Sequence, residues 1–321
     1  MRAIQITENG GPEVLNVVDL PAPDPEQGEV VVEVGAAGVN YIDTYHRGGV
    51  YEVDLPLVLG LEGAGRVLAV GDGVDDVAVG DRVAWTNTSG SYAEQVVVPA
   101  HETVPVPEGV DDVSAVGALL QGMTAWILVH QTYAVQPGDD VLVHAAAGGV
   151  GLLLTQLATG LGARVIATVS TDEKEQLARA AGAAEVLRYS DDLAEQVREL
   201  TDGVGVAVAY DGVGKTTFDA SMDSLRRRGM LVLFGAASGP VPPVDPQRLN
   251  AGGSLYLTRP TLFHHIATRE ELLGTAGSVY AEVAAGRLDV RVGHRYGLHE
   301  ARAAHEDLQA RRTTGKLVLI P

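Results

Sequence analysis

The residues that could do chemistry begin with a run of mostly small side chains at 145–151, inside the segment 141–154. Within it the pattern is Ala145-x-x-Gly148-x-x-Gly151, with Gly149 inside. It follows an apolar run and opens an amphipathic one, which predicts a buried strand, a tight turn and a helix. Small residues let backbone N–H groups at a helix N-terminus approach a phosphate, where the helix dipole favours an anion. The segment predicts a phosphate-binding turn; the alternative is a glycine-rich turn of any α/β protein.

Alternating strand and helix patterns follow this turn. Strand-like runs occur at 141–147, 164–170, 185–189, 205–211, 230–235 and 254–258, with helical runs at 149–162, 172–181, 191–201 and 215–227 between them. This alternation is typical of βαβ units with right-handed crossovers in a parallel sheet. Ligands bind outside the carboxyl ends of such strands, so we expect Asp211–Gly214 and Phe234–Ala237 to lie over the ligand. The basic run Arg226–Arg228 is expected to end a helix and complement its dipole.

Residues 1–120 show a different pattern, in which glycine and proline break short β-type runs. The candidate strands are Ala3–Thr7, Val14–Asp19, Glu29–Ala37, Gly65–Val70, Arg82–Ala84 and Glu94–Pro99. They predict a compact, partly open β-barrel with short helical pieces. In Asn40–Tyr51, polar groups and three tyrosines follow an apolar strand end. We interpret this segment as a loop that lines a pocket for a flat ligand, or as a surface loop held by tyrosine packing.

Composition narrows the classes of function. A chain of 321 residues suggests about two domains. Its formal net charge of −19 counts against binding a nucleic-acid backbone, because a polyanion would be repelled. The absence of cysteine excludes disulfides and thiolate zinc sites and fits a reducing cytoplasm. We see no apolar signal segment and no apolar run of the ~20 residues that a membrane span needs, so we expect a cytoplasmic protein.

The whole chain resembles the zinc-independent quinone oxidoreductases, which include the zeta-crystallins and belong to the medium-chain dehydrogenase/reductase superfamily. The motifs that carry the resemblance, in collinear order, are Ala36–Tyr51, Leu59–Gly65, Gly80–Val83, Gly90–Ala93, His144–Gly151, Thr168–Lys174, Tyr210–Gly214, Gly253–Pro260 and Thr314–Lys316. The resemblance implies an α/β protein with a GroES-like, mostly β domain at 1–120 and 262–321. It implies a Rossmann-type domain with a doubly wound parallel sheet at 121–261. It also implies a homodimer joined through the strand near Gly253–Thr258.

The same comparison predicts that no metal is bound. Zinc alcohol dehydrogenases of this superfamily carry a cysteine in the segment around Asn40 and a histidine where this sequence has Leu61. The chain has no cysteine, and Leu61 cannot act as a ligand. Without zinc to polarise a carbonyl, the acceptor must already be electrophilic, as a quinone is. His144, on the first strand of the parallel sheet, is expected to be a hydrogen-bonded core residue.

The end of the second strand bears on the choice of cofactor. An NAD site wants an acidic residue about 20 positions after the glycines, but Ser170 and Thr171 stand there, and Ser170–Glu173 also fits a helix capping box. In the resembled family, Lys174 and Tyr189 contact the 2′-phosphate of NADPH. We therefore expect NADPH rather than NADH, although Asp172 would oppose the phosphate if it faced the site. The predicted cofactor-binding residues are Asn40, Thr124, Ala145, Gly148, Gly149, Val150, Ser170, Lys174, Tyr189, Val213, Phe234, Gly235, Ala236, Arg259 and Lys316.

For Lys316, a place in a solvated turn is the alternative to a contact with the cofactor phosphates.

The resemblance implies NADPH-dependent reduction of quinones by hydride transfer without a metal. The residues it places at the acceptor, which are the predicted catalytic residues, are Asn40, Tyr45, Tyr51 and Thr124. Reduction of enones, enals or 2-enoyl thioesters is an open alternative on the same scaffold. A non-catalytic cofactor- or RNA-binding role is disfavoured by the net charge and the intact phosphate-binding turn, so we expect a small-molecule partner, no nucleic acid and no membrane.

Overall fold

The computed structural model describes residues 1–321, which form two compact units. Unit 1 comprises Met1–Leu120, Ile266–Ala284 and Val290–Pro321, and unit 2 comprises Gln121–His265 and Ala285–Asp289. The division falls inside helix α2 (Asp112–Ile127), which continues as a π-helical turn to Thr132. Each unit has its own hydrophobic core, so each is described separately.

Unit 2 contains a six-stranded parallel sheet. Its strands are β9 (Asp140–Val143), β10 (Arg164–Val169), β11 (Glu185–Arg188), β12 (Val206–Asp211), β13 (Leu225–Leu233) and β14 (Tyr256–Thr258). Across the sheet they lie in the order β11-β10-β9-β12-β13-β14, the 3-2-1-4-5-6 order of the Rossmann fold. The prediction of a doubly wound parallel sheet is therefore confirmed, and its topological switch point lies between β9 and β12.

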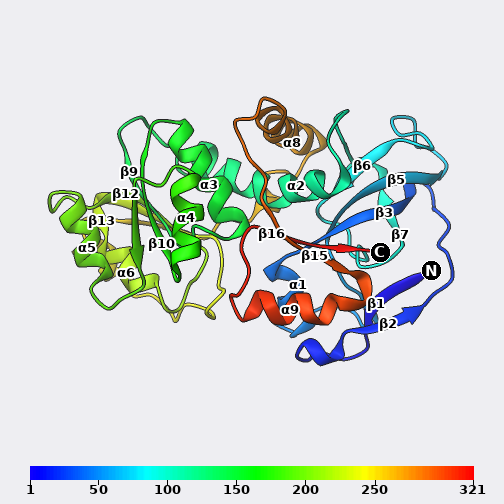
Figure 1. Ribbon diagram of the computed structural model, residues 1–321, viewed down its shortest axis with the longest axis horizontal. Helices are drawn as coiled ribbons and strands as arrows, with labels where there is room; N and C mark the ends of the chain where they lie inside the picture. The colour runs from blue at the N-terminus through cyan, green and yellow to red at the C-terminus, as the bar shows by residue number, and fades with distance from the viewer. The chain divides into compact units, whose positions relative to one another are not determined.

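Helices cover both faces of this sheet. Helices α3 (Gly149–Gly160) and α4 (Asp172–Ala180) lie on one face, and α5 (Leu193–Leu200) and α6 (Phe218–Asp223) lie on the other (Figure 1). The short helix α7 (Gln247–Ala251) precedes β14. Every residue of β12 is buried, as expected for a strand covered on both sides.

One boundary in unit 2 differs from the sequence expectation. Helix α6 ends at Asp223 and β13 begins at Leu225, so Arg226–Arg228 lies at the start of a strand. The prediction that this run ends a helix is wrong. Arg228 has a φ of 59°, and the pairing register with β12 shifts across the run. The chain bulges here, which explains why a polar segment can begin an otherwise buried strand.

Unit 1 contains two sheets. The smaller has the order β2 (Asn16–Asp19), β1 (Arg2–Ile6) and β4 (Leu57–Val58). The larger has the order β15 (Val292–Gly297), β16 (Lys316–Ile320), β3 (Glu29–Val39), β5 (Glu62–Val70), β6 (Arg82–Trp85) and β8 (Val104–Pro105), and β7 (Gln95–Pro99) also pairs with β3. The long strand β3 is central, because β7 pairs with its first half and β16 with its last residues. The C-terminal strand thus rejoins the N-terminal sheet.

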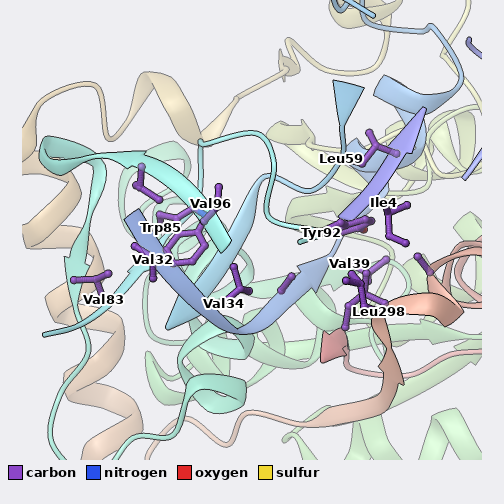
Figure 2. Packing of buried hydrophobic residues seen from close by; sticks show 14 of the residues in the cluster. Ile4, Val32, Val34, Val39, Leu59, Val83, Trp85, Tyr92, Val96 and Leu298 are labelled. Atoms are coloured by element: carbon purple, nitrogen blue, oxygen red, sulfur yellow. The ribbon is translucent and has the colours of Figure 1, made fainter. Parts of the chain in front are cut away.

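The core of unit 1 forms between these sheets and the short helices. Figure 2 shows Trp85, Tyr92 and Ile4 packed with valines of β3. Helix α1 (Tyr41–Arg47) follows β3, and helix α9 (Ala301–Gln309) precedes β16. Helix α8 (Arg269–Ala284) lies in Ile266–Ala284, the second of the three segments that form unit 1. Short 3-10 turns occupy Pro12–Val14, Ala100–Glu102 and Leu298–Glu300 in unit 1 and Leu262–His264 in unit 2.

Two sequence expectations about helices need correction. Asn40–Tyr51 is not wholly a loop, because Asn40 is the N-cap of α1 and the Asp43 carboxylate accepts a hydrogen bond from the Asn40 N–H. A helix of membrane-spanning length and hydropathy does exist, at Asp112–Thr132. About two thirds of its most apolar window (67%) is buried inside the protein, which is typical of a core helix.

Candidate functional site

The turn after β9 brings backbone very close to backbone. Ala145 has a φ of 50°, Gly148 is the N-cap of α3, and the helix begins at Gly149. A Cβ on Gly151 would overlap the carbonyl oxygen of Ala145, so only glycine allows this approach of helix to strand. The predicted residues Ala145, Gly148, Gly149 and Val150 therefore lie together at the N-terminus of α3, where an anion is favoured.

The second and third strands end beside this turn. Val169 of β10 pairs with Arg188 of β11, so Ser170 and Tyr189 leave neighbouring strands at the same edge of the sheet. The Tyr189 hydroxyl accepts a hydrogen bond of 2.8 Å from the N–H of Ala145. The sheet thus brings the predicted residues Ser170 and Tyr189 to the phosphate-binding turn.

The cap of helix α4 differs from the predicted one. Thr171 is the N-cap, and its Oγ1 accepts a hydrogen bond of 3.3 Å from the N–H of Lys174. The capping box predicted to start at Ser170 is wrong, because β10 runs to Val169 and the helix begins at Asp172. Ser170 is exposed and is not the cap, and Lys174 lies in the first turn of α4.

A buried carboxylate organises the loop after β12. Asp211 Oδ1 accepts hydrogen bonds from the N–H groups of Val213 (2.8 Å) and Gly214 (2.9 Å). Its other oxygen, Oδ2, accepts hydrogen bonds of 2.8 Å from the hydroxyls of Thr217 and Ser221. These bonds fix the conformation of the loop that carries Val213, a predicted cofactor residue.

His144 continues this network. Its Nε2 lies 2.9 Å from Ser221 Oγ and its Nδ1 lies 2.9 Å from Thr168 Oγ1. Because Ser221 donates to Asp211, the consistent assignment has Nε2–H donating to Ser221 and Nδ1 accepting from Thr168. Burial lowers the pKa of His144 and favours this neutral form. The prediction of a hydrogen-bonded core histidine is confirmed.

The loop after β13 is fastened to the loop after β12. The Phe234 N–H donates to the carbonyl of Asp211, and the Ser238 hydroxyl donates to the carbonyl of Val213. A Cβ on Gly235 would overlap the Gly212 carbonyl. Beyond β14, Arg259 Nη1 donates to the Leu233 carbonyl at 3.2 Å. The predicted residues Val213, Phe234, Gly235, Ala236 and Arg259 therefore gather at the carboxyl ends of β12, β13 and β14.

Helix α2 also contacts the phosphate-binding turn. A Cβ on Gly149 would overlap the side-chain amide of Gln121, which precedes the predicted residue Thr124 by three positions. Residues three apart share a helix face. Gln121 was not selected from the sequence, and this spacing from Thr124 is the signal that could have identified it.

In unit 1, a buried ion pair holds the side chain of Asn40. Lys316 Nζ pairs with Glu62 Oε2 and also donates a hydrogen bond of 2.9 Å to Asn40 Oδ1. Asn40 Nδ2 donates to Glu62 Oε2 at 2.9 Å, and Glu62 Oε1 accepts from the N–H of Leu120 at 2.8 Å. Both oxygens of the carboxylate and both ends of the Asn40 amide are thereby engaged.

This network gives Lys316 a different setting from the predicted one. Its side chain is 1% exposed and Glu62 is 0% exposed, so the ammonium is directed into the unit. A phosphate contact, as predicted from the sequence, would require the ammonium to leave Glu62. In the sequence, Glu62 stood out only as part of the motif Leu59–Gly65. Its pairing with Lys316 was not predicted, because no sequence pattern links it to a residue near the C-terminus.

A second buried chain of polar groups begins at Asp43. The Tyr92 hydroxyl donates to Asp43 Oδ2 at 2.9 Å and lies 3.1 Å from His305 Nε2. Arg47 Nη1 donates to His305 Nδ1 at 2.9 Å, so Nε2 carries the proton. Burial raises the pKa of Asp43 to about 7, and burial together with Arg47 lowers the pKa of His305 to about 3. Asp43 is therefore a carboxyl group that holds a proton more tightly than usual.

The predicted tyrosines lie on α1 and just after it. The rings of Tyr45 and Tyr51 meet edge to face with centroids 5.7 Å apart, and Tyr51 is 44% exposed. His46 also approaches Tyr51, with ring centroids 5.9 Å apart. Asn40, Tyr45 and Tyr51 thus come from one short stretch of unit 1, with Tyr51 presenting an aromatic face to solvent.

A Rossmann sheet with a phosphate-binding turn, together with a mostly β second unit, defines a nucleotide-dependent dehydrogenase or reductase with a GroES-like domain. Two family models agree: "Alcohol dehydrogenase GroES-like domain" matches residues 26–108 and "Zinc-binding dehydrogenase" matches residues 149–274. The chain belongs to the quinone oxidoreductase family of the medium-chain dehydrogenase/reductase superfamily, which confirms the resemblance found in the sequence.

Three relatives illustrate this membership. The quinone oxidoreductase of Salmonella typhimurium is 45% identical, covering 99% of each chain. The 2-haloacrylate reductase of a Burkholderia species is 42% identical, covering 99% of this chain and 98% of the relative. The structure of the mycobacterial protein Rv1454c complexed with NADPH is 54% identical, covers 100% of both chains and superposes with a TM-score of 0.98.

One of the two family descriptions mentions zinc binding, but this chain lacks the residues that would bind zinc. Position 61 is a buried leucine with no ligand atom, and the chain has no cysteine. No three His, Cys, Asp or Glu side chains are grouped so as to hold a metal ion. The residues present therefore do not fit a catalytic zinc site.

Proposed function

We propose that this protein uses NADPH to reduce quinones by hydride transfer without a metal. The observation that carries the proposal is full-length similarity to quinone oxidoreductases, joined to a strand end that suits NADPH. At that end, exposed Ser170 replaces the acidic residue that an NAD site wants, and Tyr189 lies against the phosphate-binding turn.

The residues of unit 2 fit NADPH. The N-terminus of α3 suits the diphosphate, and Ser170, Lys174 and Tyr189 suit the 2′-phosphate, for which Lys174 supplies a positive charge. The paired loops after β12 and β13, with Arg259 and Thr124, bind the nicotinamide half. When bound, NADPH supplies the hydride, and the protein orients it.

The acceptor is bound and polarised by neutral donors. As hydride reaches a quinone ring, negative charge develops on its oxygen and needs hydrogen-bond donors. The second N–H of Asn40 Nδ2, besides the one given to Glu62, and the Thr124 hydroxyl donate without changing charge. Tyr45 and Tyr51 offer aromatic surface to a planar acceptor. The Glu62–Lys316 pair holds the Asn40 amide in one orientation. The final proton comes from water, because none of these four side chains is a dedicated general acid with a pKa near neutral pH.

Reduction of conjugated carbonyl compounds is the second candidate function. The 42% identity to a 2-haloacrylate reductase over nearly the whole of both chains favours it specifically. Both acceptors are electrophilic before they bind, so one site without a metal can serve either.

An acceptor panel separates these functions. The loss of NADPH absorbance would be followed with benzoquinones, naphthoquinones, enones, enals and 2-haloacrylate, each with and without EDTA. We expect the highest kcat/KM with quinones, no effect of EDTA, and no oxidation of simple alcohols. Higher kcat/KM with 2-haloacrylate or enones would select the second function. Loss of activity in EDTA would refute the metal-free mechanism.

We further propose how the chain is organised and where it acts. Residues 1–120 and 262–321 form the acceptor-binding domain, residues 121–261 form the cofactor domain, and the enzyme is a cytoplasmic homodimer that binds neither nucleic acid nor membrane. Strand β14 ends the parallel sheet, and Tyr256 in it is exposed, so pairing with a second copy would satisfy this edge. Light scattering at micromolar concentration should give twice the chain mass of 33.5 kDa; a sharp monomer would refute the dimer.

A further inference from the structure

An exposed ion cluster adjoins the residues assigned to the 2′-phosphate. Arg188 Nη2, from the last residue of β11, donates to Asp172 Oδ1 at 2.7 Å and to Glu175 Oε2 at 2.8 Å. Both carboxylates lie on the first turn of α4. The Asp172 side chain is 98% exposed and that of Arg188 is 37% exposed, so the cluster lies at the surface of unit 2.

The cluster and the proposed phosphate site interleave along the chain. Ser170 follows Val169, Tyr189 follows Arg188, and Val169 and Arg188 are register partners across β10 and β11. Lys174 lies between the two acids of the cluster. A 2′-phosphate bound by Ser170, Lys174 and Tyr189 therefore lies well within a Debye length, about 10 Å at 0.1 M salt, of both carboxylates.

We infer that Arg188 secures the preference for NADPH by neutralising Asp172, whose charge would otherwise repel the 2′-phosphate. Asp172 is the acid that depends on Arg188, since Glu175 has a second partner in Arg179 at 2.9 Å. The inference rests on the proposed NADPH site. It explains how a chain with an acid three residues beyond the strand end accommodates a dianion, a conflict already visible in the sequence.

The effect belongs to cofactor binding and not to folding. Exposed ion pairs contribute little to stability because water and salt screen them. The same pair acts differently on a bound phosphate: one uncompensated charge about 4 Å away changes binding roughly fivefold even in bulk water. NADH lacks the 2′-phosphate, so its affinity serves as an internal reference for every variant.

The test measures dissociation constants for NADPH and NADH by calorimetry on the full-length protein. Arg188→Gln should weaken NADPH binding about fivefold or more and leave NADH binding within about twofold. Asp172→Asn combined with Arg188→Gln should restore most of the NADPH affinity. Arg179→Gln is the matched control, because it removes an arginine from α4, the helix that carries both acids, while Glu175 keeps Arg188; it should change neither constant. Melting temperatures should agree among the variants.

Two outcomes would overturn the inference. If Arg188→Gln has no selective effect on NADPH, the neutralisation does not matter. If the double variant remains as weak as Arg188→Gln, Arg188 binds the phosphate itself. Lys174→Ala distinguishes these failures from failure of the site. An unchanged NADPH preference in Lys174→Ala would refute the proposed 2′-phosphate assignment as a whole.

Discussion

Each unit contains a basic side chain paired with a carboxylate, Lys316 with Glu62 in unit 1 and Arg188 with Asp172 in unit 2. The first pair is buried and the second is exposed, so the first acts on structure and the second on ligand binding. In unit 1 the Lys316 and Glu62 side chains are 1% and 0% exposed, and in unit 2 those of Arg188 and Asp172 are 37% and 98% exposed. The buried pair must satisfy its hydrogen bonds internally, so it fixes the geometry of Asn40. The exposed cluster is solvated whether or not it pairs, so it changes the local field and leaves the fold alone.

The largest effect is expected from breaking the buried pair. Lys316→Met leaves the Glu62 carboxylate buried without its cation, which should cost about 3–5 kcal/mol of unfolding free energy. Arg188→Gln, the exposed counterpart, should cost less than about 1 kcal/mol. Urea unfolding of both variants checks the contrast, and equal losses would contradict it.

A double variant separates stability from positioning. Lys316→Met with Glu62→Gln removes both charges and keeps an acceptor for the Leu120 N–H. We expect most of the stability to return, since the uncompensated charge is gone. The kcat/KM for quinone reduction should remain below that of the parent in both the single and the double variant, because the donor to Asn40 Oδ1 is lost. Full recovery of kcat/KM would show that the pair does not position Asn40.

The next largest effect concerns Asp43, a second buried carboxyl group of unit 1, and the dependence of stability on pH. Burial raises its pKa to about 7, whereas an aspartate in the unfolded chain titrates near about 3.9, and its Oδ1 has no hydrogen-bond partner in the structure. Between these pH values the native state binds more protons than the unfolded state. The contribution of Asp43 to stability therefore falls as pH rises, by up to about 1.4 kcal/mol per pH unit.

Asp43→Asn should remove this dependence. His305, with a pKa lowered to about 3, works in the opposite direction and contributes stability that is lost as pH falls from about 6.5 toward 3. The stability of Asp43→Asn relative to the parent should therefore rise between about pH 4 and pH 7. Urea unfolding at several pH values measures this difference. A difference that does not vary with pH would contradict a proton on Asp43.

The smallest effect concerns the exposed face of unit 1. Tyr51→Phe keeps the ring that meets Tyr45 edge to face, so quinone kcat/KM should fall only slightly. Tyr51→Ala removes the ring and should lower kcat/KM about two- to tenfold, as expected for one aromatic contact. Both variants should melt with the parent, because Tyr51 is half exposed. Equal rates for all three proteins would remove Tyr51 from the acceptor site.

The parallel sheet could be predicted because its strands are covered on both faces and read as apolar runs, as in β12. The tight turn could be predicted because a close approach of backbone to backbone requires small residues, and the sequence shows them. The structure confirms the requirement at Gly151, where there is no room for a side chain. Helix α1 was missed, although its signal is present as Asn40 followed by Asp43 at the N3 position. The polar and tyrosine-rich segment was interpreted instead by its capacity to bind a ligand.

Pairings between distant residues lay beyond the sequence. Lys316 and Glu62 are 254 positions apart, and hydrophobic periodicity does not specify which side chains meet. The cap at Thr171 instead of Ser170 depended on where β10 ends, and both residues can cap a helix. The bulge at Arg228 likewise depended on the register between β12 and β13, which no local pattern fixes.

The most direct test of the account is the affinity of the parent and of Lys174→Ala for NADPH and NADH. The parent should bind NADPH more tightly than NADH. Lys174→Ala should lose about 1.5–3 kcal/mol of NADPH binding, the amount expected for a charge-assisted contact, and keep its NADH affinity. A parent that prefers NADH, or a variant with an unchanged preference, would contradict the assignment of the strand end as the NADPH site.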